Sequence, residues 1–240
     1  MPVCEKNYSM PDRLIITDEN QLKEVSIPEV PEQPLLIQLL AKFISWVFHP
    51  LFVPLYITYF IISVRSYQFA GIDDWLSLRT LLQVFVNCTF LPLASILLLR
   101  ALNFIDSVFL KTQKDRIIPY IICMIFYFWN WYVFKNNHEV NDLVSMSMAI
   151  FNSCVFGFLV NIFLKVSMHA ISAGVMSTFV ALLAFTDSSS FSLYLAVGVL
   201  ISGIVCTSRL IISDHSQKEI YYGFLIGVFS QLAAHYFVNS

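Results

Sequence analysis

Charged residues are scarce in this 240-residue chain, and their scarcity argues against an ordinary soluble globular protein. Asp, Glu, Lys and Arg together make up 12% of the residues, about half of the ~25% found in an ordinary soluble domain. The formal net charge of −2 provides no broad basic surface for a nucleic acid. We therefore expect the protein to contact membrane lipids and to bind no nucleic acid.

Three further absences narrow the function. The five cysteines never occur at CxxC spacing, so neither a metal site nor a disulfide framework is expected. No internal repeat is evident, which argues against a transporter built from two inverted halves. The aspartate-rich pairs with which a prenyltransferase would hold a diphosphate through magnesium are missing too.

Residues 1–34 differ in composition from the rest of the chain. They are polar, acidic and rich in proline, and they lack the basic segment followed by an apolar core that marks a cleavable signal peptide. Their low apolar content predicts a tail that is mostly disordered or lies on a surface. Residues 35–240 are expected to form one transmembrane helical domain.

Seven apolar runs lie within residues 35–240. Six of them are near the ~20 residues needed to span hydrocarbon, and the first, Leu35–Val64, is too long for one simple span. Backbone N–H and C=O groups inside lipid need partners within their own segment, so the runs are predicted to be helices. The first run is interrupted by His49-Pro50 and is predicted to be an interfacial helix that leads into a kinked span. Gly223 and Gly227 are spaced for close contact between helices. The predicted fold class is all-α, a polytopic transmembrane helical bundle with six or seven spans. The runs are Leu35–Val64, Leu81–Leu102, Ile117–Phe134, Met146–Leu164, Ala170–Phe185, Phe191–Thr207 and Ile220–Val238.

The polar segments between the runs alternate between two membrane faces. With seven crossings, the N-terminal tail shares one face with residues 103–116, 165–169 and 208–219. Most Lys and Arg residues lie on or near that face. The positive-inside rule then places it in the cytoplasm, and we expect the protein in the plasma membrane of a bacterium.

His215 and Glu219 form the most specific pair of polar residues in the chain. They are four residues apart, so on a helix they share one face and can form a hydrogen bond. A carboxylate on one imidazole nitrogen fixes the tautomer and makes the other nitrogen a better nucleophile. The pair therefore predicts a nucleophilic histidine.

Other residues on the same face suit a phosphate group. Lys111, Arg116 and Arg209 could clamp one, since arginine supplies paired donors and lysine supplies a point charge. His169 opens a predicted helix, where backbone N–H groups favour an anion. Such a histidine could also donate a proton to a leaving oxygen.

These segments resemble the three signature motifs of the type 2 phosphatidic acid phosphatase superfamily. The third family motif reads S-R-x5-H-x3-D. The chain reproduces its spacing at Ser208, Arg209, His215 and Glu219, with Glu in place of Asp. The resemblance covers roughly residues 103–240.

The other two motifs match less closely. The second, P-S-G-H, is matched at Ser167 and His169. The first, K-x6-R-P, has counterparts in Lys111 and Arg116, which are separated by four residues, and in Pro119, which comes two positions late. The order of the motifs and the two helices between the second and third also fit.

The resemblance implies a metal-independent phosphatase that acts on a lipid phosphate and needs no cofactor. His215 would attack phosphorus and Glu219 would orient it. His169 would protonate the leaving alcohol and later activate water. The residues implied to bind the phosphate oxygens are Arg209, Arg116, Lys111, Ser167 and Ser208.

Two other functions stay open. The second motif lacks the family's Pro and Gly, and with them the tight turn that brings a backbone N–H to the phosphate, so a catalytically inactive lipid-phosphate-binding protein is an alternative. A small transporter or anion channel is a third hypothesis, motivated by helix count and buried charge. The remaining histidines, His49, His138 and His235, are interpreted as structural or interfacial. The identity of the lipid and the oligomeric state also stay open.

Overall fold

The computed structural model describes residues 13–16, 22–25, 33–64, 74–105, 113–186, 191–212 and 215–240. The chain divides into two compact units, Met1–Leu35 and Leu36–Ser240. The predicted site residue Lys111 lies outside the described residues.

The first unit contains a small antiparallel sheet of two strands, β1 (Arg13–Ile16) and β2 (Leu22–Val25). Arg13 pairs with Val25, and Ile16 pairs with Leu22. The overall polarity of the tail did not predict this sheet. The apolar and β-branched residues of these two short segments favour extended backbone. Of the rest of the tail that was predicted to be mostly disordered, Gln33 and Pro34 are described, and the other residues lie outside the described part of the chain.

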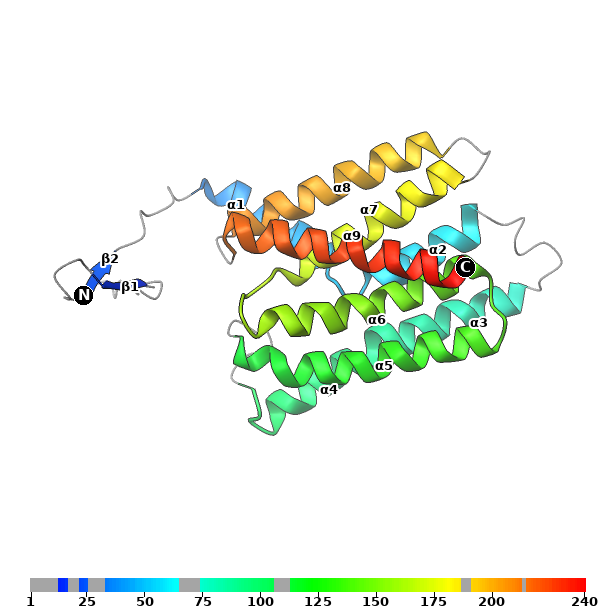
Figure 1. Ribbon diagram of the computed structural model, residues 1–240, viewed down its shortest axis with the longest axis horizontal. Helices are drawn as coiled ribbons and strands as arrows, with labels where there is room; N and C mark the ends of the chain where they lie inside the picture. Colours follow the sequence, from blue (N-terminus) through cyan, green and yellow to red (C-terminus); the bar gives the residue numbers. More distant parts are fainter. Residues whose placement is uncertain are drawn as a thin grey trace. The chain divides into compact units, whose positions relative to one another are not determined.

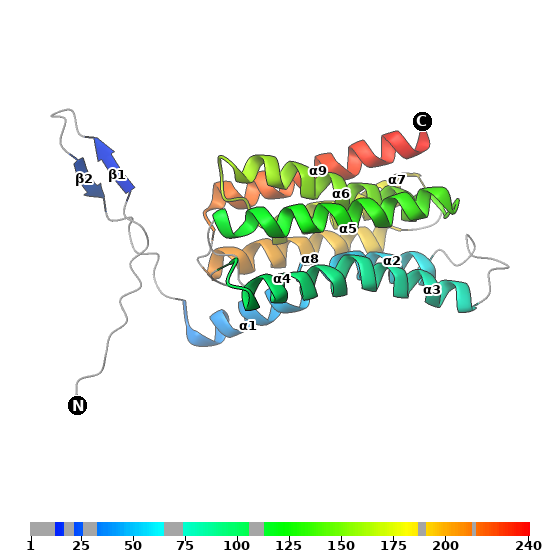
Figure 2. The ribbon, with the colours of Figure 1, turned by 90° about the horizontal axis from the view of Figure 1, so that it is seen from below.

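The second unit is a bundle of α-helices, and successive helices from α5 to α9 run in opposite directions (Figure 1). The N-terminal ends of α5 and α9 therefore lie at the same end of the bundle as the C-terminal end of α8 (Figures 1 and 2). The described parts of three polar segments that were predicted to share one face lie at this end; they are residues 103–105 and 113–116, residues 165–169, and residues 208–212 and 215–219. The helices are α1 (Leu35–Val47), α2 (Val53–Val64), α3 (Asp74–Val84), α4 (Leu91–Ala101), α5 (Ile117–Asn136), α6 (Asn141–Asn161), α7 (Met168–Thr186), α8 (Ser192–Ile211) and α9 (Gln217–Asn239).

Five helical stretches among the described residues are long and apolar enough to cross a membrane. The protein is therefore an integral membrane protein, and its helical bundle agrees with the predicted fold class. The predicted six or seven spans exceed the number of such stretches, because the first apolar run divides into the shorter helices α1 and α2, and because Gln231 and His235 interrupt the apolar sequence of α9. The five stretches are Trp75–Ala101, Ile117–Asn136, Asn141–Asn161, Met168–Phe185 and Ser192–Ile211.

The turn between α1 and α2 is fixed by hydrogen bonds to its carbonyl groups. Pro50 has no N–H and cannot continue the hydrogen-bond pattern of α1. The Tyr56 hydroxyl donates to the carbonyl of Val47 over 2.8 Å, and the buried Thr89 hydroxyl donates to the carbonyl of Leu51 over 2.7 Å. Thr89 lies in a π-helical segment, Phe85–Phe90, that joins α3 to α4. The predicted break at His49-Pro50 is thus confirmed, and a distant helix stabilises it.

Helices α7 and α9 pack with their backbones in close contact. A Cβ atom added to Gly227 would overlap the carbonyl oxygen of Ile171, and one added to Gly174 would overlap the carbonyl oxygen of Phe224. At Gly223 the added atom would lie 2.8 Å from the carbonyl oxygen of Ser167. Small residues permit this approach, as the spacing of Gly223 and Gly227 predicts.

Buried polar side chains join other helices of the bundle. The Asn130 amide of α5 donates to the Ser147 hydroxyl of α6 over 3.0 Å, and the Gln231 amide of α9 donates to the Ser145 hydroxyl of α6 over 3.2 Å. In an apolar environment each such bond contributes about 0.6 kcal/mol on average. Together with the glycine contacts, these bonds fix α6, α7 and α9 relative to one another.

The glycine contact can be tested with Gly227→Ala. We expect this variant to lower stability by about 1–3 kcal/mol, because the added methyl group forces α7 and α9 apart. Gly203→Ala is the matched control, since Gly203 is a helical glycine with no atom within 4 Å of its added Cβ; alanine there should be neutral or slightly stabilising. Thermal unfolding of both variants in lipid nanodiscs measures the difference, and equal stability of the two variants would contradict the packing argument.

Candidate functional site

A cavity of about 850 Å³ lies inside the helix bundle, and we refer to it as the central cavity. Its walls come from α1, α2, α4, α5, α6, α7 and α8 and from the segment that precedes α9. Three of the predicted sequence motifs contribute side chains to this one space. The charged and polar residues at its motif-bearing end are Lys42, Ser45, His49, Arg116, His169, Arg209 and His215.

His215 is buried immediately before α9 and is held by Glu219. Its Nδ1 atom lies 3.0 Å from Glu219 Oε2. The same carboxylate oxygen accepts from the backbone N–H of Ser216 over 3.1 Å, while the Ser216 hydroxyl accepts from the backbone N–H of Glu219. This reciprocal pair is a capping box, which requires Glu or Gln at the third helical position. The helix start therefore explains why a longer carboxylate, and not Asp, reaches the imidazole here.

The surroundings of His215 favour its neutral form. Burial, followed by the positive charges of Arg116, Arg209 and Lys165, lowers the pKa of His215 from 6.5 to about 3. A hydrogen bond with the backbone of Lys165 acts in the opposite direction and is the smaller effect. Because the carboxylate accepts at Nδ1, the neutral ring carries its proton there and has its lone pair on Nε2.

Arg116 anchors the segment that leads into α7. It is buried, and its Nη1 atom donates to the carbonyl of Val166 over 2.7 Å. The backbone N–H of Ser167 donates to the carbonyl of Glu219 over 3.2 Å. The second predicted motif is thus tied to the first by Arg116 and to the third by the first turn of α9. Cationic groups at this position can bind an anion in the central cavity.

His169 faces α1 across the central cavity. Its Nε2 atom lies 3.0 Å from the carbonyl oxygen of Ser45. A carbonyl only accepts, so Nε2 carries a proton in this arrangement. The His49 ring lies edge to face against His169, with 5.3 Å between the ring centroids. The backbone N–H of Leu51 lies 3.4 Å from His49 Nδ1, which accepts from it.

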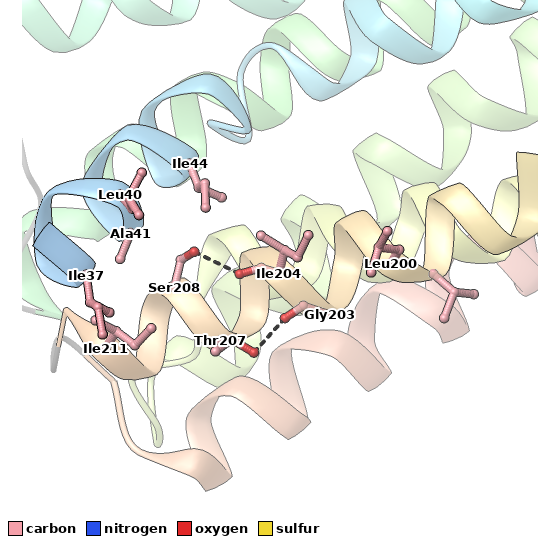
Figure 3. A pocket seen from close by; sticks show the side chains of 11 residues that line it. Ile37, Leu40, Ala41, Ile44, Leu200, Gly203, Ile204, Thr207, Ser208 and Ile211 are labelled. Atoms are coloured by element: carbon pink, nitrogen blue, oxygen red, sulfur yellow. Dashed lines mark hydrogen bonds between the residues drawn. The ribbon is translucent and has the colours of Figure 1, made fainter. Parts of the chain in front are cut away.

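Two residues predicted to bind phosphate do not line the central cavity. Ser208 borders a separate apolar groove of about 430 Å³ between α1 and α8, and its hydroxyl donates to the carbonyl of Ile204 on its own helix (Figure 3). Ser167 is fully buried, and its hydroxyl accepts from the backbone N–H of Ala170. Both hydroxyl groups form hydrogen bonds within their own helix turns in this structure, and their role in binding phosphate stays a prediction.

The structure adds residues that the sequence analysis did not place in the site. His49 was interpreted as structural or interfacial, but it lines the central cavity together with Lys42 and Ser45. Tyr120 follows Pro119 in α5 and lines the same cavity. The Ser45 and Tyr120 hydroxyl groups are buried and have no hydrogen-bond partner among the described residues. The break at His49-Pro50 was the one signal in the sequence that could have pointed to this region.

Neither a metal-binding cluster in the described residues nor a similar known protein identifies the function of this site. No group of three or more His, Cys, Asp or Glu residues in the described part of the chain could hold a metal ion. Comparison with protein-family models, curated proteins and solved structures gives no match to this chain. The function of the site is therefore inferred from its geometry, and the membership suggested by the family resemblance of its motifs stays a prediction.

The lowered pKa of His215 predicts acid sensitivity. Between pH 6.5 and about 3 the unfolded chain binds a proton that the folded chain does not, so stability is lost as the pH falls through this range. We expect the unfolding temperature to fall on acidification from pH 7 to pH 4.5, and to fall less in His215→Gln. His138→Asn is the control, because His138 is exposed and has a positive φ that Asn tolerates. The same acid response in His215→Gln and the wild type would contradict the assignment.

Proposed function

We propose that this chain is a membrane-embedded phosphatase that hydrolyses a lipid phosphate monoester with His215 as the nucleophile. One observation carries the proposal: His215, His169, Arg116 and Arg209 come from three separate segments and line the same cavity, with Glu219 on the imidazole of His215. The resemblance of these segments to the motifs of the type 2 phosphatidic acid phosphatases supports the same chemistry.

The first step transfers the phosphoryl group to the protein. The Nε2 lone pair of His215 forms a bond to phosphorus while the bond from phosphorus to the alcohol oxygen breaks. His169 takes up a proton when the phosphate dianion binds, and the resulting imidazolium gives the departing oxygen a proton from Nε2, which requires this N–H to leave the Ser45 carbonyl. Arg116 and Arg209 neutralise the charge on the phosphoryl oxygens.

The second step releases the phosphate. A water molecule attacks the phosphohistidine and gives a proton to His169, and the bond between phosphorus and Nε2 breaks. Orthophosphate leaves, and both histidines return to their starting states. Glu219 keeps the His215 ring oriented through both steps, because it is itself fixed by Ser216. The mechanism uses no metal ion.

We also propose a membrane topology for this function. The α1–α2 pair forms one broken crossing, α3 and α4 form one continuous crossing, and α5 to α9 form five more, which gives seven. The site then lies on the cytoplasmic face of a bacterial plasma membrane. Support comes from the basic side chains at the site end of the bundle, compared with Arg79 and Lys135 at the other end. Those at the site end include Lys42, Arg100, Arg116, Lys165, Arg209 and Lys218.

A catalytically inactive lipid-phosphate-binding protein is the second candidate. Two hydrogen bonds favour it: the Arg116 guanidinium is bonded to the carbonyl of Val166, and the His169 imidazole is bonded to the carbonyl of Ser45. Both groups would have to exchange these partners during turnover. A binding protein needs only a positively charged, partly apolar pocket, and the same residues supply it.

Phosphate release from a panel of lipid phosphates, measured with purified protein in a chelator, tests the catalytic proposal. His215→Ala should reduce turnover at least ~10³-fold, and His169→Ala should reduce it ~10²- to 10⁴-fold. His138→Asn should retain full activity. Metal-independent turnover that disappears in His215→Ala supports the phosphatase. Lipid-phosphate binding without turnover on any lipid would favour the binding protein.

Glu219→Gln separates the structural role of Glu219 from its catalytic one. Glutamine also forms a capping box, so we expect little change in unfolding temperature. It removes the negative charge that stabilises the imidazolium and fixes the tautomer, so turnover should fall ~10²- to 10⁴-fold. Loss of stability and activity together would show that the carboxylate acts mainly in folding.

A further inference from the structure

We infer that the central cavity receives the hydrocarbon chain of its lipid inside the helix bundle, and that the substrate is therefore a phosphate monoester with a single chain. This inference rests on the proposed function for the position of the phosphate group. It adds a substrate class, single-chain alkyl, prenyl or monoacyl phosphates, in preference to lipids with two acyl chains. It also places the chain in the protein interior, away from the surrounding bilayer.

The two ends of the central cavity differ in chemistry. One end holds Arg116, Arg209 and the three histidines. The walls beyond it are apolar, and they include buried side chains from α2, α5, α6 and α7. Such apolar walls do not stabilise an anion, whereas they suit a hydrocarbon chain. The apolar residues on which this argument depends are Val53, Ile57, Cys123, Tyr127, Ile150 and Val175.

The depth of the cavity suits one extended chain. Arg116 and Tyr127 both line it and are eleven positions apart on the chain, so at ~1.5 Å of rise per helical residue they are separated by about 16 Å along α5. A C–C bond of ~1.5 Å advances a zigzag chain by roughly 1.25 Å, so a chain of about a dozen carbon atoms covers this distance. A phosphate at Arg116 therefore places the chain end near Tyr127 and Ile150.

The volume of the central cavity can be compared with the space that lipids with one or two hydrocarbon chains need. The central cavity measures about 850 Å³. If a methylene group takes up about as much space as a water molecule in the liquid, ~30 Å³, one sixteen-carbon chain with its phosphate needs roughly 600 Å³. Two such chains with a glycerol need more than roughly 1,000 Å³ by the same count. By this count the cavity holds one whole chain, and part of a second chain would have to lie outside it.

The position of the cavity argues for a specific occupant. Its walls belong to the main hydrophobic core, which includes Ile57, Tyr127, Ile150 and Cys154. Apolar surface favours contact with hydrocarbon over contact with water. The apolar part of this cavity therefore suits a hydrocarbon chain.

A buried hydroxyl group provides a second, independent indication of a ligand. Ser45 Oγ belongs to a side chain that is more than nine-tenths buried and lines the cavity without a hydrogen-bond partner among the described residues. Leaving a buried polar group unsatisfied is unfavourable. Ser45 lies at the charged end, where its carbonyl contacts His169, so a phosphate ester oxygen is the partner that fits its hydroxyl.

Chain-length dependence tests the inference. Monoalkyl phosphates from ethyl to octyl, used as monomers in water with the protein in nanodiscs, should show kcat/KM rising a few-fold for each added methylene, because each one leaves water for the apolar walls. Longer monoalkyl and monoacyl phosphates should reach a plateau once the chain meets the floor of the cavity. Diacyl phosphatidic acid should be at least ten-fold worse than its monoacyl counterpart. Equal rates for the two would overturn the inference.

Ser153→Phe tests the route of the chain. Ser153 lines the cavity on α6, and its hydroxyl donates to the Ile150 carbonyl of its own helix, so a phenylalanine ring would fill the space and remove no contact with another helix. The plateau should move to shorter chains, and the octyl-to-ethyl ratio of kcat/KM should fall at least ten-fold. Leu232→Phe, at an exposed position of α9, is the matched control and should keep the wild-type ratio. Ser153→Ala checks folding and should also keep the ratio.

Binding measurements distinguish this inference from the proposed function. If no phosphate is released, the affinities of the same alkyl phosphates are measured by their effect on thermal stability. Affinity that rises with chain length and is reduced by Ser153→Phe then supports the chain site while the phosphatase proposal fails. Phosphate release that is independent of chain length and unaffected by Ser153→Phe supports the phosphatase and overturns the chain site. If any membrane hydrocarbon fills the cavity, neither phosphate release nor the thermal stabilisation by alkyl phosphates would depend on chain length.

Discussion

The backbones of α7 and α9 lie so close together that Gly174, Gly223 and Gly227 have room for hydrogen alone at their Cα atoms. This contact sets the distance between the start of α7 and the first turn of α9, where the backbone N–H of Ser167 donates to the carbonyl of Glu219. His169, on the first turn of α7, and His215, in the segment before α9, lie beside this close contact and line the same cavity. The relative position of the two proposed catalytic histidines is therefore a consequence of helix packing.

Glu219 connects the start of α9 with the proposed chemistry of His215. Its carboxylate closes the N-terminus of α9 and also holds the His215 ring, so the requirements of the helix and of the imidazole are met by one side chain. The resemblance to the type 2 phosphatidic acid phosphatases places Asp at this position. The S-x-x-E pattern of Ser216 and Glu219 gives a local reason for the longer residue, since the capping box uses Glu or Gln.

The helical fold could be predicted because lipid allows few structures: a long apolar run must satisfy its own backbone, and the runs from Leu81 onward do become helices. The β1–β2 sheet was not predicted, because it depends on two four-residue segments within a polar tail. In the site, the spacing of His215 and Glu219 predicted their contact. The S-R pair did not predict that Arg209 lines the central cavity while Ser208 borders the separate groove between α1 and α8, because this depends on how α8 is rotated against α1. His49, Ser45 and Tyr120 join the site through contacts between distant segments, which a motif does not record.

The contact between His169 and α1 has a consequence for how this protein can vary. The acceptor is the main-chain carbonyl of Ser45, so the contact depends on where α1 lies and is independent of which side chain occupies position 45. Alanine scanning along α1 would leave it intact, and so would neutral drift of the surface of that helix. An insertion of one residue between Ser45 and the turn at Pro50 would rotate the carbonyl by ~100° and remove it. The length of this short segment is therefore under tighter constraint than its composition.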